Sequence, residues 1–596
     1  MRRILLFFSM VFMTSSTLIA QEHIKFEVSF KEPQAHYVEV SMHISNLKRD
    51  YVDLRMPVWS PGSYLIREYP KNVEGFSARA NGEEVASEKT NKNTWRVHTK
   101  GQSTIEVSYR VYAFEVSVRT SFVDASHAFL SPTGVFMFID EQLDLPAEVE
   151  VKPYGQWASI STGLPKVEGK SNTFYAENFD ILFDSPIEVG NQDIFYFNAA
   201  GVQYEVAMVG GGNYDKEKLK KDMATIVEAQ TAIYGENPNE RYVFIVHNYH
   251  SGGGGLEHLN STVLGASRFA YNTGQGYKSF LGLVAHEHFH LWNVKRLRPE
   301  NIGPFDYSVE NYTPNLWISE GFTAYYDNHT LRRCGFYRQK EYLDVLANDI
   351  ASVENRPGNL VQPLSSSSFD AWIKQYRPDE NSYNTTVTYY TKGAIIAMLL
   401  DLGILDATKG EKRLDDVMKA MYNKYYLDEN RGFTRAEFEA MVAQVAGVSL
   451  SDVFAYVDVA TPIDYNKYLN LAGLQLVGVS ASTQGTTIGM RVSTRDGRAY
   501  VSTVYRGGGA WDGGLNVGDE LIAIDGFRVQ DYRSDIERVL ADAKLGSTLE
   551  FLISRDGRMM ELSIEVRKET QKSYVILELD QASEGQVEIR RKWLGE

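Results

Sequence analysis

The sequence is poor in cysteine, in basic residues and in long apolar runs. Only one of its 596 residues is a cysteine, Cys334, so no disulfide can form within the chain and the fold must rest on apolar cores. There are 61 basic against 77 acidic residues, and the net charge of −16 argues against nucleic acid and anionic membranes as partners. Beyond the amino terminus we expect no run long enough to span a bilayer.

Residues 1–20 have the pattern of a secretory signal peptide. Arg2 and Arg3 precede an apolar stretch, and small polar residues lead to Ala20. No cysteine follows, which argues against a bacterial lipid anchor, and an uncleaved amino-terminal anchor is the alternative. A large exported chain without disulfides fits a periplasm better than a disulfide-rich secreted scaffold. We therefore expect a periplasmic protein in which Cys334 is a packing residue.

The most informative motif is HExxH, formed by His286, Glu287 and His290 at the end of an apolar run. On a helix, residues four apart lie on one face, so both imidazoles can reach one metal ion. Zinc accepts such ligands, and a carboxylate beside a zinc-bound water can take its proton. His288 lies between the two and points away from their face, so we expect it to be a packing residue or a neighbour of the ligands. The motif indicates a zinc hydrolase.

A third ligand must come from elsewhere in the chain. The metzincin arrangement is excluded, because Arg296 stands where its third histidine would be. Glu320 lies in a helix-like run of mainly apolar residues, 315–326, which leaves little polar surface for a solvated carboxylate. We therefore favour Glu320 as the third ligand, with Asp327 as a distant second choice.

A run of four glycines follows a predicted buried strand at 241–246. In Ser-Gly-Gly-Gly-Gly-Leu-Glu-His, Gly254 and Gly255 would let a peptide backbone approach an edge strand. Glu257 would then stand where it can bind a substrate's free amino terminus. The alternative is a flexible surface turn. Further on, Tyr389 and Tyr390 precede a helical run, and a tyrosine hydroxyl there could stabilise a developing oxyanion. Neither segment is specific by itself.

Helical patterns recur from residue 214 to about residue 460. They include Lys216–Tyr234 and Arg435–Ala446, and the residues Phe433-Thr434-Arg435-Ala436-Glu437 have the pattern of a capped helix start. Before residue 191 the chain instead alternates apolar and polar residues in short runs, which favours a β-sandwich. After about residue 470 it returns to short strands and glycine turns.

The order of these motifs resembles the gluzincin metallopeptidases. Gly-Gly-Leu-Glu-His, HExxH, Trp-x-x-Glu-Gly and Tyr-x-Lys-Gly are most similar to the glycyl aminopeptidase family, and aminopeptidase N is a more distant relative. Residues 56–67 are similar to the first domain of that family, and 513–526 resemble a bacterial PDZ signature. The expected domains are a signal peptide (1–20), an N-terminal β-sandwich (21–191), an α+β thermolysin-like catalytic domain (192–469), a PDZ domain (470–570) and a C-terminal extension (571–596).

The resemblance implies a role for each matching residue. His286, His290 and Glu320 match the ligands of one zinc ion, and Glu287 matches the general base. Tyr390 matches the tyrosine that stabilises the transition state, and Glu257, with Gly254 and Gly255, matches the segment that binds the substrate and its amino group. The family suggests small first residues such as Gly or Ala. Where some gluzincins have an acidic residue four after the glutamate ligand, this chain has Ala324, so another group must orient the histidines.

The PDZ-like segment suggests a second peptide site. Ile488, Gly489 and Met490 resemble the loop that binds a terminal carboxylate, and 534–543 would be the helix beside the groove. The alternative is that this domain only supports the catalytic domain.

Three functions follow from the sequence. The leading one is a periplasmic zinc aminopeptidase that acts on peptides with a free amino terminus. The second is a zinc endopeptidase whose PDZ domain recruits protein carboxyl termini. The third is an inactive peptide-binding protein, against which the intact Glu287 argues.

Overall fold

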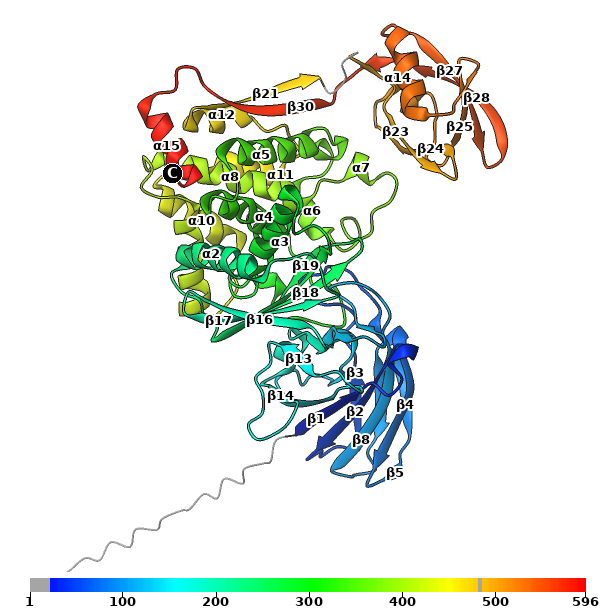
Figure 1. Ribbon diagram of the computed structural model, residues 1–596, viewed down its shortest axis with the longest axis vertical. Helices are drawn as coiled ribbons and strands as arrows, with labels where there is room; N and C mark the ends of the chain where they lie inside the picture. Colours follow the sequence, from blue (N-terminus) through cyan, green and yellow to red (C-terminus); the bar gives the residue numbers. More distant parts are fainter. Residues whose placement is uncertain (1–21, 481–484) are drawn as a thin grey trace, which may run out of the picture.

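The computed structural model describes residues 22–480 and 485–596, so the predicted signal peptide lies outside the described residues. Three units follow one another: a β-rich amino-terminal domain, a catalytic domain built largely of helices, and a PDZ-type domain at the far end (Figure 1). The multidomain fold expected from the sequence is confirmed.

The amino-terminal domain is built from sheets that share one core. Phe26 and Val28 of the larger sheet and Leu54 and Val97 of a smaller sheet are all buried in the same apolar cluster, which is the arrangement of a β-sandwich. The alternation read from the sequence is visible in β2, whose residues are buried at every second position. The larger sheet has the order β14 (Thr173–Ala176), β12 (Ala147–Lys152), β1 (His23–Ser29), β2 (Tyr37–Ser45), β8 (Thr104–Tyr112), β4 (Val73–Ala80), β5 (Glu83–Glu84). The smaller sheet has the order β11 (Phe138–Ile139), β3 (Tyr51–Arg55), β7 (Thr94–His98), β6 (Ser87–Asn91).

A further four-stranded sheet joins this domain to the next. Phe129 of the joining sheet packs with Val243 and Val263 of the catalytic domain in a separate buried cluster. The first two domains therefore share apolar contacts. The joining sheet has the order β13 (Ser159–Thr162), β15 (Ile187–Gly190), β10 (Ala128–Leu130), β9 (Phe122–Val123).

The catalytic domain combines a five-stranded sheet with a group of helices. Strand β19 lies at one edge of the sheet and is antiparallel to its neighbour β20, while β17, β18 and β20 run parallel. The sheet order is β16 (Asp193–Ala199), β17 (Val202–Val209), β18 (Arg241–Tyr249), β20 (Ser261–Ser267), β19 (Gly254–Glu257). The longer helices are α2 (Lys216–Tyr234), α3 (Gly274–Phe289), α4 (Leu316–Arg333), α5 (Gln339–Glu354), α8 (Tyr389–Ala407), α9 (Leu414–Met421), α10 (Arg435–Ala446) and α11 (Ser451–Asp458).

Two of these helices have the ends expected from the sequence, because their caps are local. Asp215 accepts a hydrogen bond from the backbone of α2, and Gly235 closes that helix with a φ of 92°. Thr434 and Glu437 form a capping box at the start of α10. Helix α8 begins earlier than the expected run, so Tyr390 lies in its first turn rather than before it.

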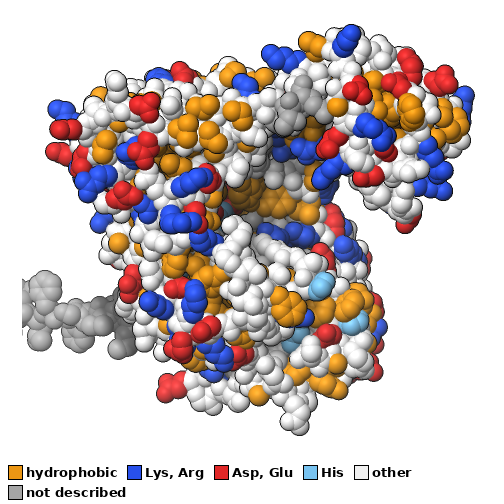
Figure 2. All heavy atoms as spheres, turned by 45° about the horizontal axis from the view of Figure 1, so that its top comes forward, with side chains coloured by type: hydrophobic (Ala, Val, Ile, Leu, Met, Phe, Trp, Pro, Cys, Tyr) orange, Lys and Arg blue, Asp and Glu red, His pale blue; other side chains and the backbone are white. Residues whose placement is uncertain are grey.

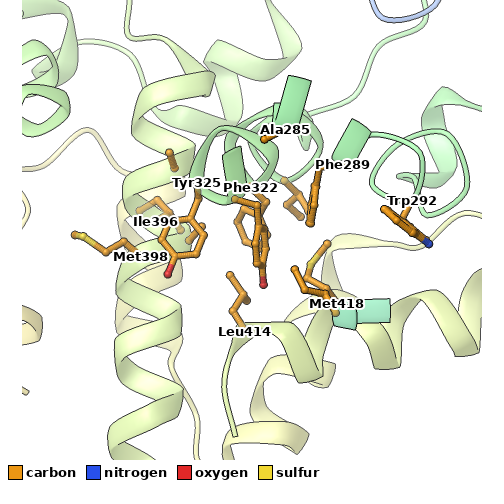
Figure 3. Close-up of a cluster of buried hydrophobic side chains, with 14 of the residues drawn as sticks. Ala285, Phe289, Trp292, Phe322, Tyr325, Ile396, Met398, Leu414 and Met418 are labelled. Atoms are coloured by element: carbon orange, nitrogen blue, oxygen red, sulfur yellow. The ribbon is translucent and has the colours of Figure 1, made fainter. Parts of the chain in front are cut away.

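The residues behind the HExxH helix form a dense apolar core. Figure 3 shows Ala285 and Phe289 of α3 facing Phe322 and Tyr325 of α4, with Met418 of α9 beneath them. These side chains are buried. Close packing of this kind restricts side-chain and helix movement, so α3 and α4 hold their polar residues in fixed positions.

Helix α8 is long and apolar. A segment from Ser382 to Ala407 would be long and apolar enough to cross a membrane, so the expectation that no later run reaches this length is wrong by length and hydropathy alone. In the fold, 83% of that window is buried inside the protein, as in a core helix.

The PDZ-type domain is carried by a two-stranded ribbon. Strand β21 (Leu474–Ser480) pairs with β30 (Lys572–Glu578), and the domain lies between them in the chain. After the ribbon, α15 (Glu584–Leu594) returns to the catalytic domain, where Trp593 is buried in the main core. The PDZ-type sheet has the order β23 (Met490–Arg495), β24 (Arg498–Val504), β25 (Glu520–Ile524), β27 (Thr548–Arg555), β28 (Arg558–Glu565), with α14 (Tyr532–Asp542) beside it.

Candidate active site

The structure brings His286, His290 and Glu320 together. His290 follows the last residue of α3 but keeps a helical backbone, so both histidines project from one face. Their Nε2 atoms are 3.2 Å apart, and Glu320 Oε2 lies 3.2 Å from His290 Nε2 and 3.7 Å from His286 Nε2. His290 and Glu320 are buried. The three side chains therefore converge on one point, as a single metal ion requires.

The outer nitrogen of each histidine is held by a hydrogen-bond acceptor. His290 Nδ1 is 2.7 Å from the backbone oxygen of Asn293, and His286 Nδ1 is 3.0 Å from Asp327 Oδ2. Because these oxygens accept, the proton of each neutral imidazole is on Nδ1 and the Nε2 lone pairs face each other. Two lone pairs at 3.2 Å repel each other unless a cation lies between them. The donors therefore fit zinc, whose histidine ligands usually donate their other N–H in this way.

Asp327 has a different role from the one considered in the sequence. The side chain named there as the second choice for a ligand instead orients His286. It lies seven residues after Glu320, two turns along the same face of α4, and it supplies the acidic group that Ala324 does not. The i, i+7 spacing of Glu320 and Asp327 was the signal that could have identified it.

Glu287 points into the same site. Its Oε2 is buried without a hydrogen-bond partner among the described residues. Burial raises the pKa of Glu287 to about 7, while His286 and His290 act to lower it. The carboxylate lies against Gly255 of β19: a Cβ atom at Gly255 would be 2.1 Å from Glu287 Oε1. A side chain at this position would displace Glu287, so the glycine allows the backbone to approach the candidate base closely.

The site opens into a cleft of about 550 Å³ between the first two domains. Its lining includes Gly254, Glu257 and Tyr390 from the catalytic domain and Gly62 and Arg119 from the amino-terminal domain. The sequence did not indicate Arg119, because it is far from the other residues in the chain. In the space-filling view of Figure 2 the surface is deeply hollowed between the PDZ-type domain, at upper right, and the rest of the molecule.

Glu257 lines this cleft and is almost fully buried. It is 4% exposed, and one of its oxygens is within 4.8 Å of ligand atoms of both Glu287 and His290. Gly62, in the segment 56–67, packs against it: a Cβ atom at Gly62 would be 2.4 Å from Glu257 Oε1, and the glycine has a φ of +81°. The amino-terminal domain therefore covers the glutamate that the sequence assigned to the substrate amine.

Two glycines explain how Tyr390 reaches the site. A Cβ atom at Gly321 of α4 would be 2.5 Å from the Cα of Gly393 of α8, so only glycines allow these helices to approach so closely. The contact places the first turn of α8 beside Glu320. The Tyr390 ring stacks on His286 with centroids 6.4 Å apart, and its hydroxyl is 3.4 Å from that of Tyr376. Burial raises the pKa of Tyr390 well above its ordinary value, so the hydroxyl keeps its proton.

Two other residues are packing residues. His288 points away from the site, where its Nε2 lies 3.0 Å from the Tyr204 hydroxyl and its Nδ1 lies 2.8 Å from Gln230 Oε1. Burial lowers its pKa to about 3, so it stays neutral. Burial also raises the pKa of the Cys334 thiol to about 11, which keeps this side chain unreactive near neutral pH.

The predicted PDZ loop has the geometry of a tight turn beside an open strand. Ile488 is buried, Gly489 has a φ of +78°, and Met490 begins β23, the edge strand of the sheet. Helix α14 lies close to the expected range 534–543. The loop residues thus lead directly into an edge strand of the sheet.

A second cluster of two histidines and a glutamate lies between the amino-terminal and catalytic domains. His127 Nδ1 is 2.7 Å from Glu188 Oε1, and His247 Nε2 is 2.9 Å from Glu188 Oε2. Each carboxylate oxygen thus has its own imidazole, at hydrogen-bond distance. Glu188 is fully buried. The cluster is a hydrogen-bonded bridge between domains, and its residues are too far apart along the chain for any local spacing to indicate it.

The comparisons with known proteins agree with this fold. Residues 25–191 match the Peptidase M61 N-terminal domain, 279–396 match the M61 glycyl aminopeptidase domain, and 486–566 match a PDZ domain. The resemblance to the glycyl aminopeptidase family is confirmed by these matches. They support a metallopeptidase whose catalytic domain includes His286, Glu287, His290, Glu320 and Tyr390. No curated protein matches the chain.

Solved structures are similar over most of the chain. An aminopeptidase N family protein from Idiomarina loihiensis has 29% sequence identity and a TM-score of 0.89, over 96% of this chain and 100% of that one. An M1 zinc metallopeptidase from Deinococcus radiodurans has 13% identity and a TM-score of 0.47, over 74% and 94%. Aminopeptidase A from Legionella pneumophila has 12% identity and a TM-score of 0.47, over 94% and 57%.

Proposed function

Because the chain carries the domains of the M61 glycyl aminopeptidase family in order, we propose that it is a zinc aminopeptidase that removes small first residues, Gly or Ala, from peptides. The observation that carries the proposal is the position of Glu257: a buried carboxylate, covered by Gly62, within 4.8 Å of ligand atoms of Glu287 and His290. A carboxylate there can bind an ammonium group one residue away from the bond to be cleaved. The family match supports the preference for small residues.

His286, His290 and Glu320 would hold one zinc ion. When bound, zinc polarises the scissile carbonyl and lowers the pKa of a water molecule beside it. Glu287 takes a proton from the attacking water and delivers one to the leaving amine. Its raised pKa suits a group that must both accept and donate a proton near neutral pH. Asp327 and the Asn293 carbonyl fix the orientation of the two imidazoles.

Tyr390 and Glu257 act on the substrate itself. The Tyr390 hydroxyl, which keeps its proton, donates a hydrogen bond to the carbonyl oxygen as negative charge develops there. Glu257 binds the free amino group and so sets the distance from the amino terminus to the cleaved bond. Blocking the amine removes this ion pair and leaves a buried carboxylate without a partner.

The test compares peptides with a free amino terminus and the same peptides acetylated, using wild type, Glu287→Gln and Glu257→Gln. We expect acetylation and Glu257→Gln each to lower kcat/KM by at least about a hundredfold and Glu287→Gln to abolish turnover. A panel of first residues gives the preference, with Gly and Ala expected to lead. Equal cleavage of free and acetylated peptides would overturn the aminopeptidase assignment. Stoichiometric zinc with no cleavage by wild type would favour the inactive peptide-binding protein.

The endopeptidase alternative has one observation in its favour. Strand β23 is an open edge next to the predicted carboxylate loop, so an extended protein carboxyl terminus can add to it. Replacing 481–571 by a short linker that joins the β21–β30 ribbon separates the two functions. If the PDZ domain recruits substrates, the deletion weakens cleavage of proteins and leaves cleavage of dipeptides intact. Export to a periplasm, which the pattern of 1–20 supports, is tested by cell fractionation.

A further inference from the structure

Arg119 is a charged residue that lines the cleft and forms no direct ion pair among the described residues. It belongs to the amino-terminal domain and reaches across to β19, where its Nη2 donates to the Gly255 oxygen at 2.9 Å. Its Nε is buried without a hydrogen-bond partner, and it forms no ion pair with a carboxylate in the described part of the chain. Burial acts to lower the pKa of Arg119, but nearby groups that include Glu287 and Glu257 outweigh burial and raise it, so the guanidinium keeps its charge.

The carboxylates of the cleft favour the charge of Arg119 but do not contact its guanidinium as ion pairs. Glu257, Glu287 and Glu320 all line the same cleft as Arg119. None of them forms an ion pair with it among the described residues, and Glu320 is instead directed at the two histidines. The guanidinium is therefore free to meet an anion that enters the cleft from outside, and its planar fork matches a carboxylate.

The order of groups along β19 indicates which part of a peptide meets Arg119. Glu257 is at the carboxyl end of the strand, Gly255 lies against Glu287, and Gly254 comes next; a Cβ atom at Gly254 would be 3.6 Å from Arg119 Nη1. Strand positions are about 3.3 Å apart. A peptide with its amine at Glu257 and its scissile bond beside Glu287 runs antiparallel to β19, so its leaving part lies towards Gly254 and Arg119.

We propose that Arg119 binds the free carboxylate of short peptides, so that dipeptides and tripeptides are the preferred substrates of this cleft. This inference rests on the proposed aminopeptidase function, because the direction of the peptide is set by its amine at Glu257. Longer peptides place their carboxylate beyond the reach of Arg119 and gain nothing from it. Arg119 also holds the Gly255 carbonyl, so it limits how far a long chain can extend along the free edge of β19.

The experiment uses the full chain and Gly-initiated dipeptides, tripeptides and pentapeptides, each as the free acid and as the carboxyl-terminal amide. In wild type we expect kcat/KM to favour the acid by about ten- to a hundredfold for the dipeptide or tripeptide, mainly through KM, and by less than threefold for the pentapeptide. In Arg119→Gln the acid-to-amide ratio should fall to about one, and Arg119→Lys should keep part of it. Zinc content and thermal unfolding of each variant control for misfolding.

A second readout does not depend on turnover. Binding of the dipeptide acid and amide to the Glu287→Gln protein is measured by calorimetry, with and without Arg119→Gln. The proposal requires the acid to bind more tightly only when Arg119 is present. It is overturned if acid and amide bind equally to Glu287→Gln, if Arg119→Gln weakens both equally, or if only peptides with an acidic first residue depend on Arg119. Loss of all dependence on the free amine, with the acid preference retained, would contradict the aminopeptidase function and not the carboxylate site.

Discussion

Two clusters in this molecule each contain two histidines and a glutamate, but in different geometries. They are the HExxH cluster at Glu320 and the interdomain cluster at Glu188. In the HExxH cluster the imidazole centroids are 4.8 Å apart and two Nε2 lone pairs face each other. In the interdomain cluster the centroids are 6.0 Å apart, and each imidazole N–H is directed at its own oxygen of Glu188. The facing lone pairs of the HExxH cluster need a cation between them to be stable. In the interdomain cluster, hydrogen bonds from the imidazole N–H groups to Glu188 already stabilise the arrangement. Residue type alone therefore does not define a metal site.

The difference arises from the elements that carry the residues. His286 and His290 are four apart on one helix, so their rings come from one face and share one point. Their outer nitrogens are occupied by Asp327 and the Asn293 carbonyl, which leaves Nε2 for a ligand bond. His127 and His247 come from different domains. The outer nitrogen of His247 lies 3.2 Å from the Tyr249 hydroxyl.

The largest effect is expected from His290→Ala. Removing one of three ligands should abolish stoichiometric zinc binding and lower kcat/KM by at least about a thousandfold. The matched control is His127→Ala, which removes the corresponding imidazole of the other cluster and should keep one zinc per chain. Zinc content by elemental analysis and hydrolysis of a free dipeptide check both. Zinc loss in His127→Ala would mean that the two clusters are not different in kind.

Glu188→Ala should lower the stability of the fold more than His290→Ala does. Loss of Glu188 leaves the buried imidazole of His247 and the half-buried imidazole of His127 without their shared acceptor, and it should lower the free energy of unfolding by about 3 kcal/mol. Zinc content should remain at one per chain. The measurement is urea unfolding followed together with zinc content. An unfolding free energy within about 0.5 kcal/mol of wild type would contradict the bridge.

Asp327→Asn tests whether an orienting carboxylate distinguishes the HExxH cluster from the interdomain cluster. Loss of the carboxylate that orients His286 should weaken zinc affinity by about ten- to a hundredfold while the fold stays intact. Competition with a chelator of known affinity measures this. Thr323 is the control position, because its hydroxyl is 3.4 Å from His290 Nδ1 and Thr323→Val should change the affinity less. Equal affinities for wild type and Asp327→Asn would remove Asp327 from the site.

The interdomain bridge should also depend on pH. Burial acts to lower the pKa of His127, but Glu188 outweighs burial and raises this pKa above its ordinary value. The ion pair of His127 with Glu188 therefore stabilises the fold fully below about pH 6.5, and this contribution is lost as the pH rises through the raised pKa. Burial raises the pKa of Glu188, but the two histidines outweigh burial and lower it, so its contribution is lost only in acid. The stability difference between wild type and Glu188→Gln should therefore be greatest in mildly acidic solution, below about pH 6.5, and should shrink as the pH rises above neutral. A difference that grows with rising pH would contradict this assignment.

The smallest effect is expected from Tyr249→Phe. It removes one hydroxyl near His247 Nδ1 and should change the free energy of unfolding by about 1 kcal/mol or less, with no change in zinc content. Thermal unfolding of the zinc-loaded protein measures this. A measurable drop in zinc content would indicate that Tyr249 orients a metal ligand, as Asp327 does.

Local patterns carried most of what the sequence predicted. The ends of α2 and α10 follow from caps that lie next to them, and the two histidines of α3 follow from helical spacing. Glu320 and Tyr390 lie close together because Gly321 of α4 contacts Gly393 of α8. This contact depends on how the two helices pack, so neither helix predicts it alone. Both glycines belong to motifs that the sequence shows, but the sequence does not show that they are needed for the close contact between the two helices.

Long-range contacts carried most of what the sequence did not predict. Gly62 and Arg119 enter the cleft from another domain, and nothing in their neighbours along the chain points to Glu257 or β19. Asp327 was considered as a ligand because carboxylates bind zinc, yet its place on α4 relative to Glu320 makes it the partner of His286. The bridge at Glu188 joins residues from three separate strands and loops, so no spacing rule applies to it.

Anomalous X-ray scattering at the zinc absorption edge, from crystals of the zinc-loaded protein, tests directly whether only the HExxH cluster binds a metal ion. We expect one peak, between His286, His290 and Glu320, and none at Glu188. A peak at Glu188, or the absence of one beside Glu320, would contradict this expectation.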